Sequence, residues 1–383
     1  MTTTEKWPGR VALMVAHCAG MVDLVALPVW VGTLISAYKF DPQQAGGLAT
    51  LFLAGAVVSS LFFAPRFNRL NRKLVASLGF GLSALAFGIA STQTGFGMMA
   101  LCHALAGLAA GSALSVTHGT IGRSANPHRM FAMVGLALGI FAVIFLGAVP
   151  NIVAAVGGAA MFQIFAGVMV VAAVTSLLLF PQPEQAQGTD FDIAHPRFSK
   201  AVWAGVIGVS LMALNQAMVF SFFERIGADR GYTVEAITLV LIVLGFVNLV
   251  PAPLAALLQK RLSAEKVVTT GPIVQAALAL LITMVAAYPA YVAGGAVYIA
   301  VMIFTHTFAF GLLSRLDPTG RALAATPAML MTGAAVGPIL GGTLVKFSGY
   351  PAIGIAVVIV AVLAVICFSQ ARVSHTAKVQ AAA

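Results

Sequence analysis

A series of twelve apolar runs constrains this chain more than any other feature of its sequence. A helix needs about 20 mostly apolar residues to cross a bilayer, and polar residues separate the runs. Only 8% of the 383 residues are charged, against about 25% in soluble domains. We therefore expect an all-α membrane protein and exclude a soluble enzyme. The predicted spans are 11–36, 45–65, 74–91, 97–119, 131–149, 158–180, 201–225, 234–258, 267–287, 291–313, 322–345 and 351–370.

The positive charges predict how these spans are oriented. Of 21 Lys and Arg residues, only Lys39, Arg225, Arg230 and Lys346 lie on the side opposite to the termini. Cytoplasmic loops carry the excess of Lys and Arg in membrane proteins, so we expect both termini in the cytoplasm and the chain in the inner (plasma) membrane. The net charge of +10 then follows from topology, and nucleic acid is excluded as a partner.

The longest polar stretch divides the chain into two similar halves. We expect an N-terminal six-helix bundle over 1–183, a cytoplasmic linker over 184–199 and a C-terminal six-helix bundle over 200–383. One pattern occurs in both halves: Ala-Pro, then six residues, then two basic residues. It begins at Ala64 and ends with Arg72-Lys73, and it recurs 188 positions later from Ala252 to Lys260-Arg261. The repeat follows the second span of each half, which indicates a duplicated six-helix unit.

The segment 64–73 (APRFNRLNRK) resembles the signature loop between spans two and three of the major facilitator superfamily. The resemblance implies a gating role for Asn68, Arg69 and Arg72, although Asn68 stands where an Asp is usual. A Gly-Pro pattern at Gly337-Pro338 is similar to a signature of drug:proton antiporters, but it lies in span eleven instead of span five. We expect Gly337 and Pro338 to act in gating as well.

That resemblance extends over the whole chain and implies a fold and a mechanism. Two pseudo-symmetric six-helix bundles would rock about a central cavity, with spans one, four, seven and ten facing it. His103 in span four occupies a position where the family usually carries Arg. The implied function is secondary active transport of a small organic solute by alternating access, by symport or antiport.

Ionisable side chains deep in a membrane are costly and mark functional sites. Asp23 lies near the midplane of span one, where a carboxyl can bind and release a proton in each cycle, and Pro28 predicts a kink beside it. Imidazole titrates in the physiological range, so His103 is the second candidate for proton coupling. A permanent structural hydrogen bond is the alternative for both residues.

Four further polar residues in the expected cavity spans are candidates for substrate binding: Asn215, Gln216, His306 and His17. Glu224 and His118 lie closer to span ends, where we expect solvated or capping roles. No Arg or Lys lies in the middle of a span, so a multiply charged organic anion is a poor candidate for the substrate.

Two alternatives within transport stay open. Clusters such as Met98-Met99-x-x-Cys102-His103 are typical of soft Cu(I) ligands, so a copper importer of the same fold is one, and a drug:proton efflux antiporter is the other. A non-transporting membrane receptor or scaffold is the alternative from another class. We expect no enzymatic activity, no cofactor and no bound metal in the organic-solute transporter, which would act as a monomer in the lipid bilayer on its substrate and protons.

Overall fold

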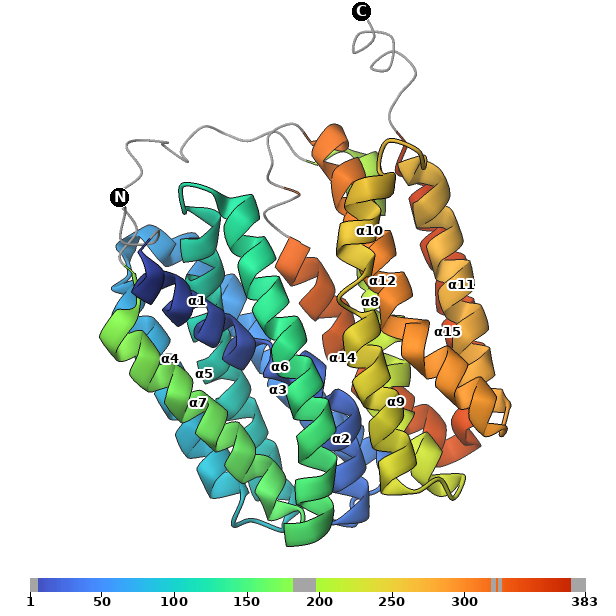
Figure 1. Ribbon diagram of the computed structural model, residues 1–383, viewed down its shortest axis with the longest axis horizontal. Helices are drawn as coiled ribbons and strands as arrows, with labels where there is room; N and C mark the ends of the chain where they lie inside the picture. The colour runs from blue at the N-terminus through green and yellow to red at the C-terminus, as the bar shows by residue number, and fades with distance from the viewer. Residues whose placement is uncertain (1–5, 182–197, 318–321, 323–325, 373–383) are drawn as a thin grey trace, which may run out of the picture.

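The computed structural model describes residues 6–181, 198–317, 322 and 326–372, and within them every regular element is a helix (Figure 1). Twelve of the helical segments in this part of the chain are long and apolar enough to cross a membrane. The predicted all-α fold with twelve spans is therefore confirmed. Most of the expected linker at 184–199 lies outside the described residues, so the division of the chain there stays a prediction.

The first half of the chain supplies six spans, which occupy one side of the molecule in Figure 1. Span one is formed by two helices, and a short 3-10 helix follows span two. The elements are α1 (Trp7–Gly20), α2 (Val22–Ser36), α3 (Pro42–Phe63), η1 (Ala64–Arg69), α4 (Arg72–Ala90), α5 (Phe96–Gly122), α6 (Pro127–Val156) and α7 (Ala159–Leu179).

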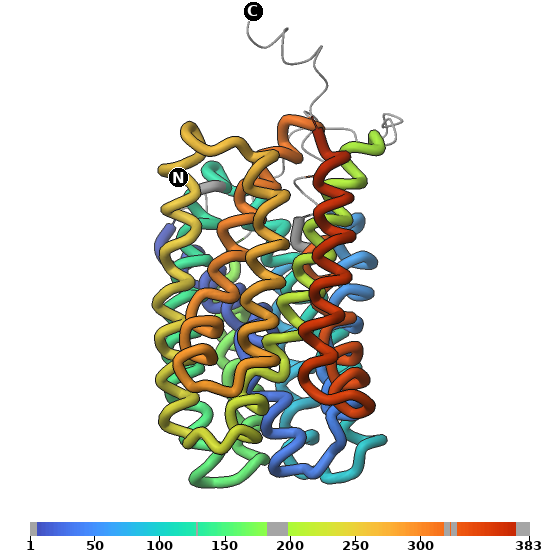
Figure 2. Tube along the Cα trace, turned by 90° about the vertical axis from the view of Figure 1, so that its right-hand side faces the viewer, coloured from blue at the N-terminus to red at the C-terminus, as the bar shows by residue number. Residues whose placement is uncertain are grey.

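The second half supplies the other six spans, and Figure 2 shows its long helices side by side along a common axis. Span eight is again formed by two helices. The elements are α8 (Lys200–Asp229), α9 (Val234–Val247), α10 (Pro251–Leu258), α11 (Ala264–Met284), α12 (Tyr288–Leu316), α14 (Thr326–Ser348) and α15 (Tyr350–Gln370).

Local sequence explains where many of these helices begin. The side chain of Asp41 accepts a hydrogen bond from the Gln44 backbone amide, and Gln44 reciprocates, which forms a capping box before α3. Five other helices are each capped through one side-chain oxygen: α4 by Asn71, α6 by Asn126, α8 by Ser199, α9 by Thr233 and α11 by Ser263.

Burial separates central spans from peripheral ones. Spans one, seven, four and ten are the most enclosed, with 78, 67, 61 and 56% of their apolar windows buried, whereas span five has only 22%. Side chains such as Leu257, 76% exposed, lie on outer faces, where a bilayer would cover them. The four central spans are those that the resemblance assigned to the cavity.

The two halves of the chain meet along three helix pairs: α3 with α14, α2 with α8, and α6 with α9. We call the end of the array that carries Arg69, Arg123 and Arg261 the basic end, and the end that carries Asp41 and Lys346 the opposite end. Glycine brings α3 and α14 close together, because a Cβ on Gly46 would lie 2.1 Å from the Pro338 carbonyl oxygen.

Candidate transport site

Asp23 lies at a break in the first span. The helix ends at Gly20, Met21 leaves helical geometry, and a second helix begins at Val22. Asp23 thus occupies the first turn of α2, where the helix dipole favours a negative charge. The interruption at Met21 lies seven residues before Pro28, which is inside α2. The break beside Asp23 is therefore not at the proline where the sequence predicted a kink.

The carboxyl of Asp23 is enclosed and unpartnered. The residue is 1% exposed, and neither carboxylate oxygen has a hydrogen-bond partner among the described residues. A buried polar group without a partner is costly, and such groups persist where function requires them. The position therefore suits a carboxyl that changes its protonation state.

Glu224 is a second acidic group inside the helix array, at the seam between the halves. Its carboxyl on α8 lies against the backbone of α2, where a Cβ on Gly32 would be 1.7 Å from its Oε2 atom. Oε2 is buried and has no hydrogen-bond partner within the described part of the chain. The solvated or capping role expected for Glu224 is wrong, because its position near a span end did not reveal which face it occupies.

His103 lies in an aromatic enclosure. It is fully buried, and its ring lies nearly parallel to that of Trp30, with an interplanar angle of 21° and 5.3 Å between centroids. Its Nδ1 donates to the Met99 carbonyl at 2.6 Å, and its Nε2 accepts from the Trp30 indole N–H at 3.3 Å. Phe87 and Phe162 approach edge-on. Both ring nitrogens are thus engaged by a neutral imidazole, and a second proton would have to displace Trp30.

His17 and His118 form a pair that was not predicted from the sequence. The Nδ1 atom of His17 lies 3.0 Å from the Nε2 atom of His118, so one ring donates and the other accepts. His118 also meets the ring of Phe131 edge-on. This contact between α1 and α5 replaces the solvated role expected for His118, and it takes one nitrogen of His17 away from substrate binding.

The remaining substrate-binding candidates have different surroundings. Asn215 is fully buried and donates to the Val357 carbonyl of α15 at 3.3 Å, while its Oδ1 atom has no partner among the described residues. Gln216 is half-buried. His306 is half-buried, with an Nδ1 atom lacking a partner in the same part of the chain. Gln216 and His306 therefore stay candidates, whereas Asn215 also joins two helices.

The predicted gating loop packs against its own half. Asn68 and Arg69 are exposed in η1. Two guanidinium groups contact the buried ring of Phe67: that of Arg72 lies 5.0 Å and that of Arg123 4.1 Å from the ring centroid. These cation–π contacts fasten the loop to the end of α5, and a gating role for the loop stays a prediction.

Gly337 and Pro338 lie where three helices meet. A Cβ on Gly337 would lie 2.7 Å from the Met218 backbone nitrogen of α8, and the Pro338 carbonyl meets Gly46 of α3. The next amide, on Ile339, donates to the Thr50 hydroxyl at 3.1 Å. The Gly-Pro pattern thus lies at the seam between the halves, and the gating role expected for it stays a prediction.

Polar contacts close this seam at the opposite end. Lys346 donates to Asp41 at 3.0 Å and to Gln43 at 3.2 Å, and Gln43 donates to Thr343 at 3.2 Å. Partial burial raises the pKa of Asp41, but hydrogen bonds from Gln44 and Lys346 outweigh it and hold the pKa below its usual value. The carboxylate therefore stays charged and keeps its partner.

Metal ligands do not gather in the described residues, which contain no group of three or more His, Cys, Asp or Glu side chains able to hold an ion. The nitrogens of His103 are occupied by Met99 and Trp30, so the Met98-Met99-x-x-Cys102-His103 cluster does not present a free imidazole.

Sequence reasoning missed Trp30, although the need of a buried indole N–H for an acceptor could have drawn attention to it.

Comparisons with known proteins agree with this architecture. A family model described as Major Facilitator Superfamily matches residues 12–316. The crystal structure of the nucleoside transporter NupG is similar, with a TM-score of 0.74 and 14% identity over 95% of this chain and 99% of that one. No curated protein matches the chain.

A second similar structure is a bacterial homolog of the human lysosomal transporter Spinster in an inward-facing and occupied conformation. It has a TM-score of 0.72 and 13% identity, covering 94% of this chain and 95% of that chain. At 13–14% identity, these similarities show that the two proteins share their fold with this chain.

Proposed function

Because the chain belongs to the Major Facilitator Superfamily, we propose that it is a secondary active transporter that moves a small organic solute by alternating access and is driven by protons. The seam between the halves supports this mechanism. Glycines and a Gly-Pro pattern bring α3 and α14 into close contact, and smooth contacts of this kind allow packed helices to rearrange. Gly337 and Pro338 would act in gating at this seam.

The proposed orientation places the basic end in the cytoplasm of a cell bounded by an inner (plasma) membrane. The excess of Lys and Arg on that end supports it. The contacts of Asp41, Gln43 and Lys346 then close the external side of the protein.

Asp23 carries the proposal for proton coupling. Its buried carboxyl lacks a hydrogen-bond partner among the described residues and lies at the first turn of a half-helix. Discontinuous helices with functional groups at their ends are typical of transporter binding sites. His103, the second coupling candidate, already has a partner at each ring nitrogen. We therefore assign the proton to Asp23 and the positioning of Trp30 to His103.

The substrate class follows from the charges inside the helix array. Asp23 and Glu224 are acidic, and no span carries Arg or Lys in its middle. A neutral, zwitterionic or cationic organic solute therefore fits better than an anion. Gln216 and His306 would supply its hydrogen bonds, with a contribution from the free Oδ1 atom of Asn215.

The experiment uses purified protein in proteoliposomes. A library of organic cations, zwitterions and nucleosides is first screened by thermal shift at two pH values. Uphill uptake of a hit is then measured under an imposed pH gradient. Asp23→Asn should abolish uphill uptake and leave exchange of the hit across the membrane, because only the proton site is lost.

The matched control is Glu235→Gln, which removes an exposed carboxyl in the first turn of α9. It should leave uphill uptake unchanged. Full uphill uptake by Asp23→Asn would refute coupling at Asp23, and the absence of any solute movement by the wild type would refute transport.

A further inference from the structure

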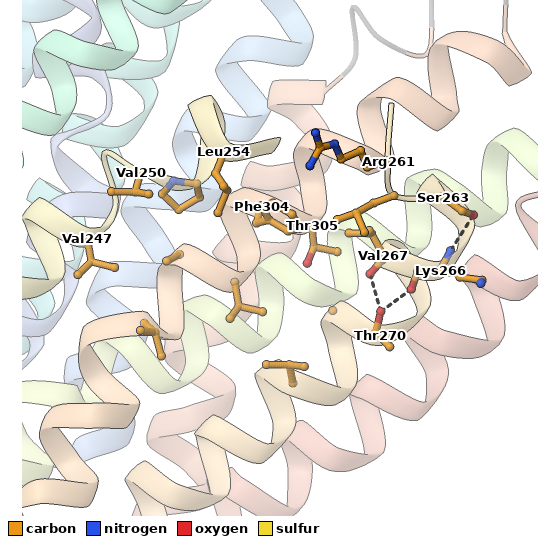
Figure 3. Close-up of a pocket in the computed structure, with 17 residues that line it drawn as sticks. Val247, Val250, Leu254, Arg261, Ser263, Lys266, Val267, Thr270, Phe304 and Thr305 are labelled. Atoms are coloured by element: carbon orange, nitrogen blue, oxygen red, sulfur yellow. Dashed lines mark hydrogen bonds between the residues drawn. The ribbon is translucent and has the colours of Figure 1, made fainter. Parts of the chain in front are cut away.

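A groove of about 730 Å³ lies within the second half of the molecule, and all of its lining residues belong to that half. Its walls come from α9, α10, α11 and α12, and Figure 3 shows the lining side chains. The groove extends along α11 from Ser263, at its N-cap, to Val274. At 1.5 Å per residue this is a length of about 16 Å, roughly half of a bilayer core about 30 Å thick.

The groove is polar at one end and apolar along its length. Arg261, Ser263 and Lys266 line it at the basic end. Aliphatic and aromatic side chains continue the lining toward the middle of the spans, including Leu254, Val301 and Phe304.

The two cations have no acidic partner in the part of the chain that the structure describes. The salt bridges among the described residues are Arg225–Asp229 and Lys346–Asp41, and none of these four residues lines the groove. Arg261 and Lys266 are exposed. The nearby acid, Glu265, accepts a hydrogen bond from the Ser263 hydroxyl. The polar end of the groove therefore presents positive charge at the surface where lipid headgroups lie.

The apolar part of the groove opens sideways. Its lining residues Val250, Val274 and Val297 are 55, 45 and 37% exposed. These residues belong to helices long and apolar enough to span a membrane, so the face they open to is the one covered by acyl chains. A molecule can enter the groove from the lipid without passing through water.

We propose that this groove binds one anionic phospholipid from the surrounding bilayer, with its headgroup at the polar end lined by Arg261, Ser263 and Lys266 and an acyl chain along Val301 and Phe304. Basic pockets between membrane-spanning helices bind anionic headgroups. Charge complementarity selects an anionic lipid over a zwitterionic one, and the lateral opening selects a lipid over a solute from water. The proposal does not depend on the proposed transport function.

The test is native mass spectrometry of the delipidated, detergent-purified protein with equal amounts of phosphatidylglycerol and phosphatidylcholine. The wild type should retain phosphatidylglycerol preferentially. Arg261→Gln should lower the ratio of bound phosphatidylglycerol to phosphatidylcholine about fivefold, the change expected for loss of one cation near an anionic headgroup. Val301→Phe fills the apolar part and should reduce retention of both lipids.

Lys260→Gln is the matched control, because Lys260 is the exposed neighbour of Arg261 and does not line the groove. It should keep the preference of the wild type. Equal retention of the two lipids by the wild type would mean a neutral occupant and would overturn the proposal. Equal losses in Arg261→Gln and Lys260→Gln would mean diffuse attraction to the surface and would also overturn it. Size-exclusion profiles establish that each variant is folded.

Discussion

Lys346 on α14 donates a hydrogen bond to Asp41, the N-cap residue of α3, at 3.0 Å. The two residues are 305 positions apart, and their contact joins the two halves at the end opposite to the basic loops. Asp41 also caps α3 through the Gln44 backbone amide. One carboxylate therefore fixes the start of a helix and fastens that helix to the other half.

Removing the charge of Asp41 should loosen this closure without damaging α3. Asp41→Asn keeps the capping oxygen, since Asn caps helices as well as Asp. The exposed pair contributes at most about 1 kcal/mol, so opening should increase up to about fivefold. This opening is measured by the rate of thiol labelling at Ala45→Cys, because Ala45 is fully buried in the first turn of α3. The rate is normalised to that of an exposed cysteine at Thr94→Cys.

The pH dependence of this closure has a definite sign. The pKa of Asp41 lies below its ordinary value, so the ion pair is complete above that ordinary value and is lost only as the pH falls through the lowered pKa. As the pH falls through the lowered pKa, normalised labelling at Ala45→Cys should rise when Asp41 is present. It should not rise in the Asp41→Asn variant. Lys346→Gln should behave like Asp41→Asn, and Lys39→Gln, an exposed cation in the same region, should not.

Gly46 and Gly47 offer a matched test of the contact between α3 and α14. A Cβ on Gly46 would lie 2.1 Å from the Pro338 carbonyl oxygen, a rigid backbone atom, whereas one on Gly47 would lie 3.2 Å from the flexible end of Ile339. Gly46→Ala should therefore destabilise the closed state by about 1–3 kcal/mol, and Gly47→Ala by much less. Thermal unfolding midpoints measure both, and equal midpoints would contradict the close approach.

The spans could be predicted from the sequence because each depends only on its own length and composition. The pairs that define the site could not, since helix packing brings them together. His103 and Trp30 are 73 positions apart, and His17 and His118 are 101 apart. Glu224 shows the same limit: its depth along span seven was readable, but the direction of its carboxyl toward Gly32 depends on how α8 meets α2.

The contact between Trp30 and His103 should stabilise the first half. Trp30→Phe leaves the buried Nε2 of His103 without a donor, at a cost of about 1–3 kcal/mol. Combining it with His103→Phe should cost less than the sum of the two single variants, because each removes the same contact. Thermal unfolding measures the cycle. Loss of proton-driven uptake in His103→Phe, with uptake intact in Asp23→Asn, would instead assign coupling to His103.

Gly32 should be required because the carboxyl of Glu224 occupies the space beside it. A Cβ on Gly32 would lie 1.7 Å from Oε2 and 2.7 Å from Cδ of Glu224, so Gly32→Ala must push the carboxyl out of the seam and lower the unfolding midpoint. In a Glu224→Ala background the added methyl group no longer meets the carboxyl, and the penalty of Gly32→Ala should be much smaller. Gly167→Ala, which meets open space on α7, is the control, and an undiminished penalty in the Glu224→Ala background would refute the contact.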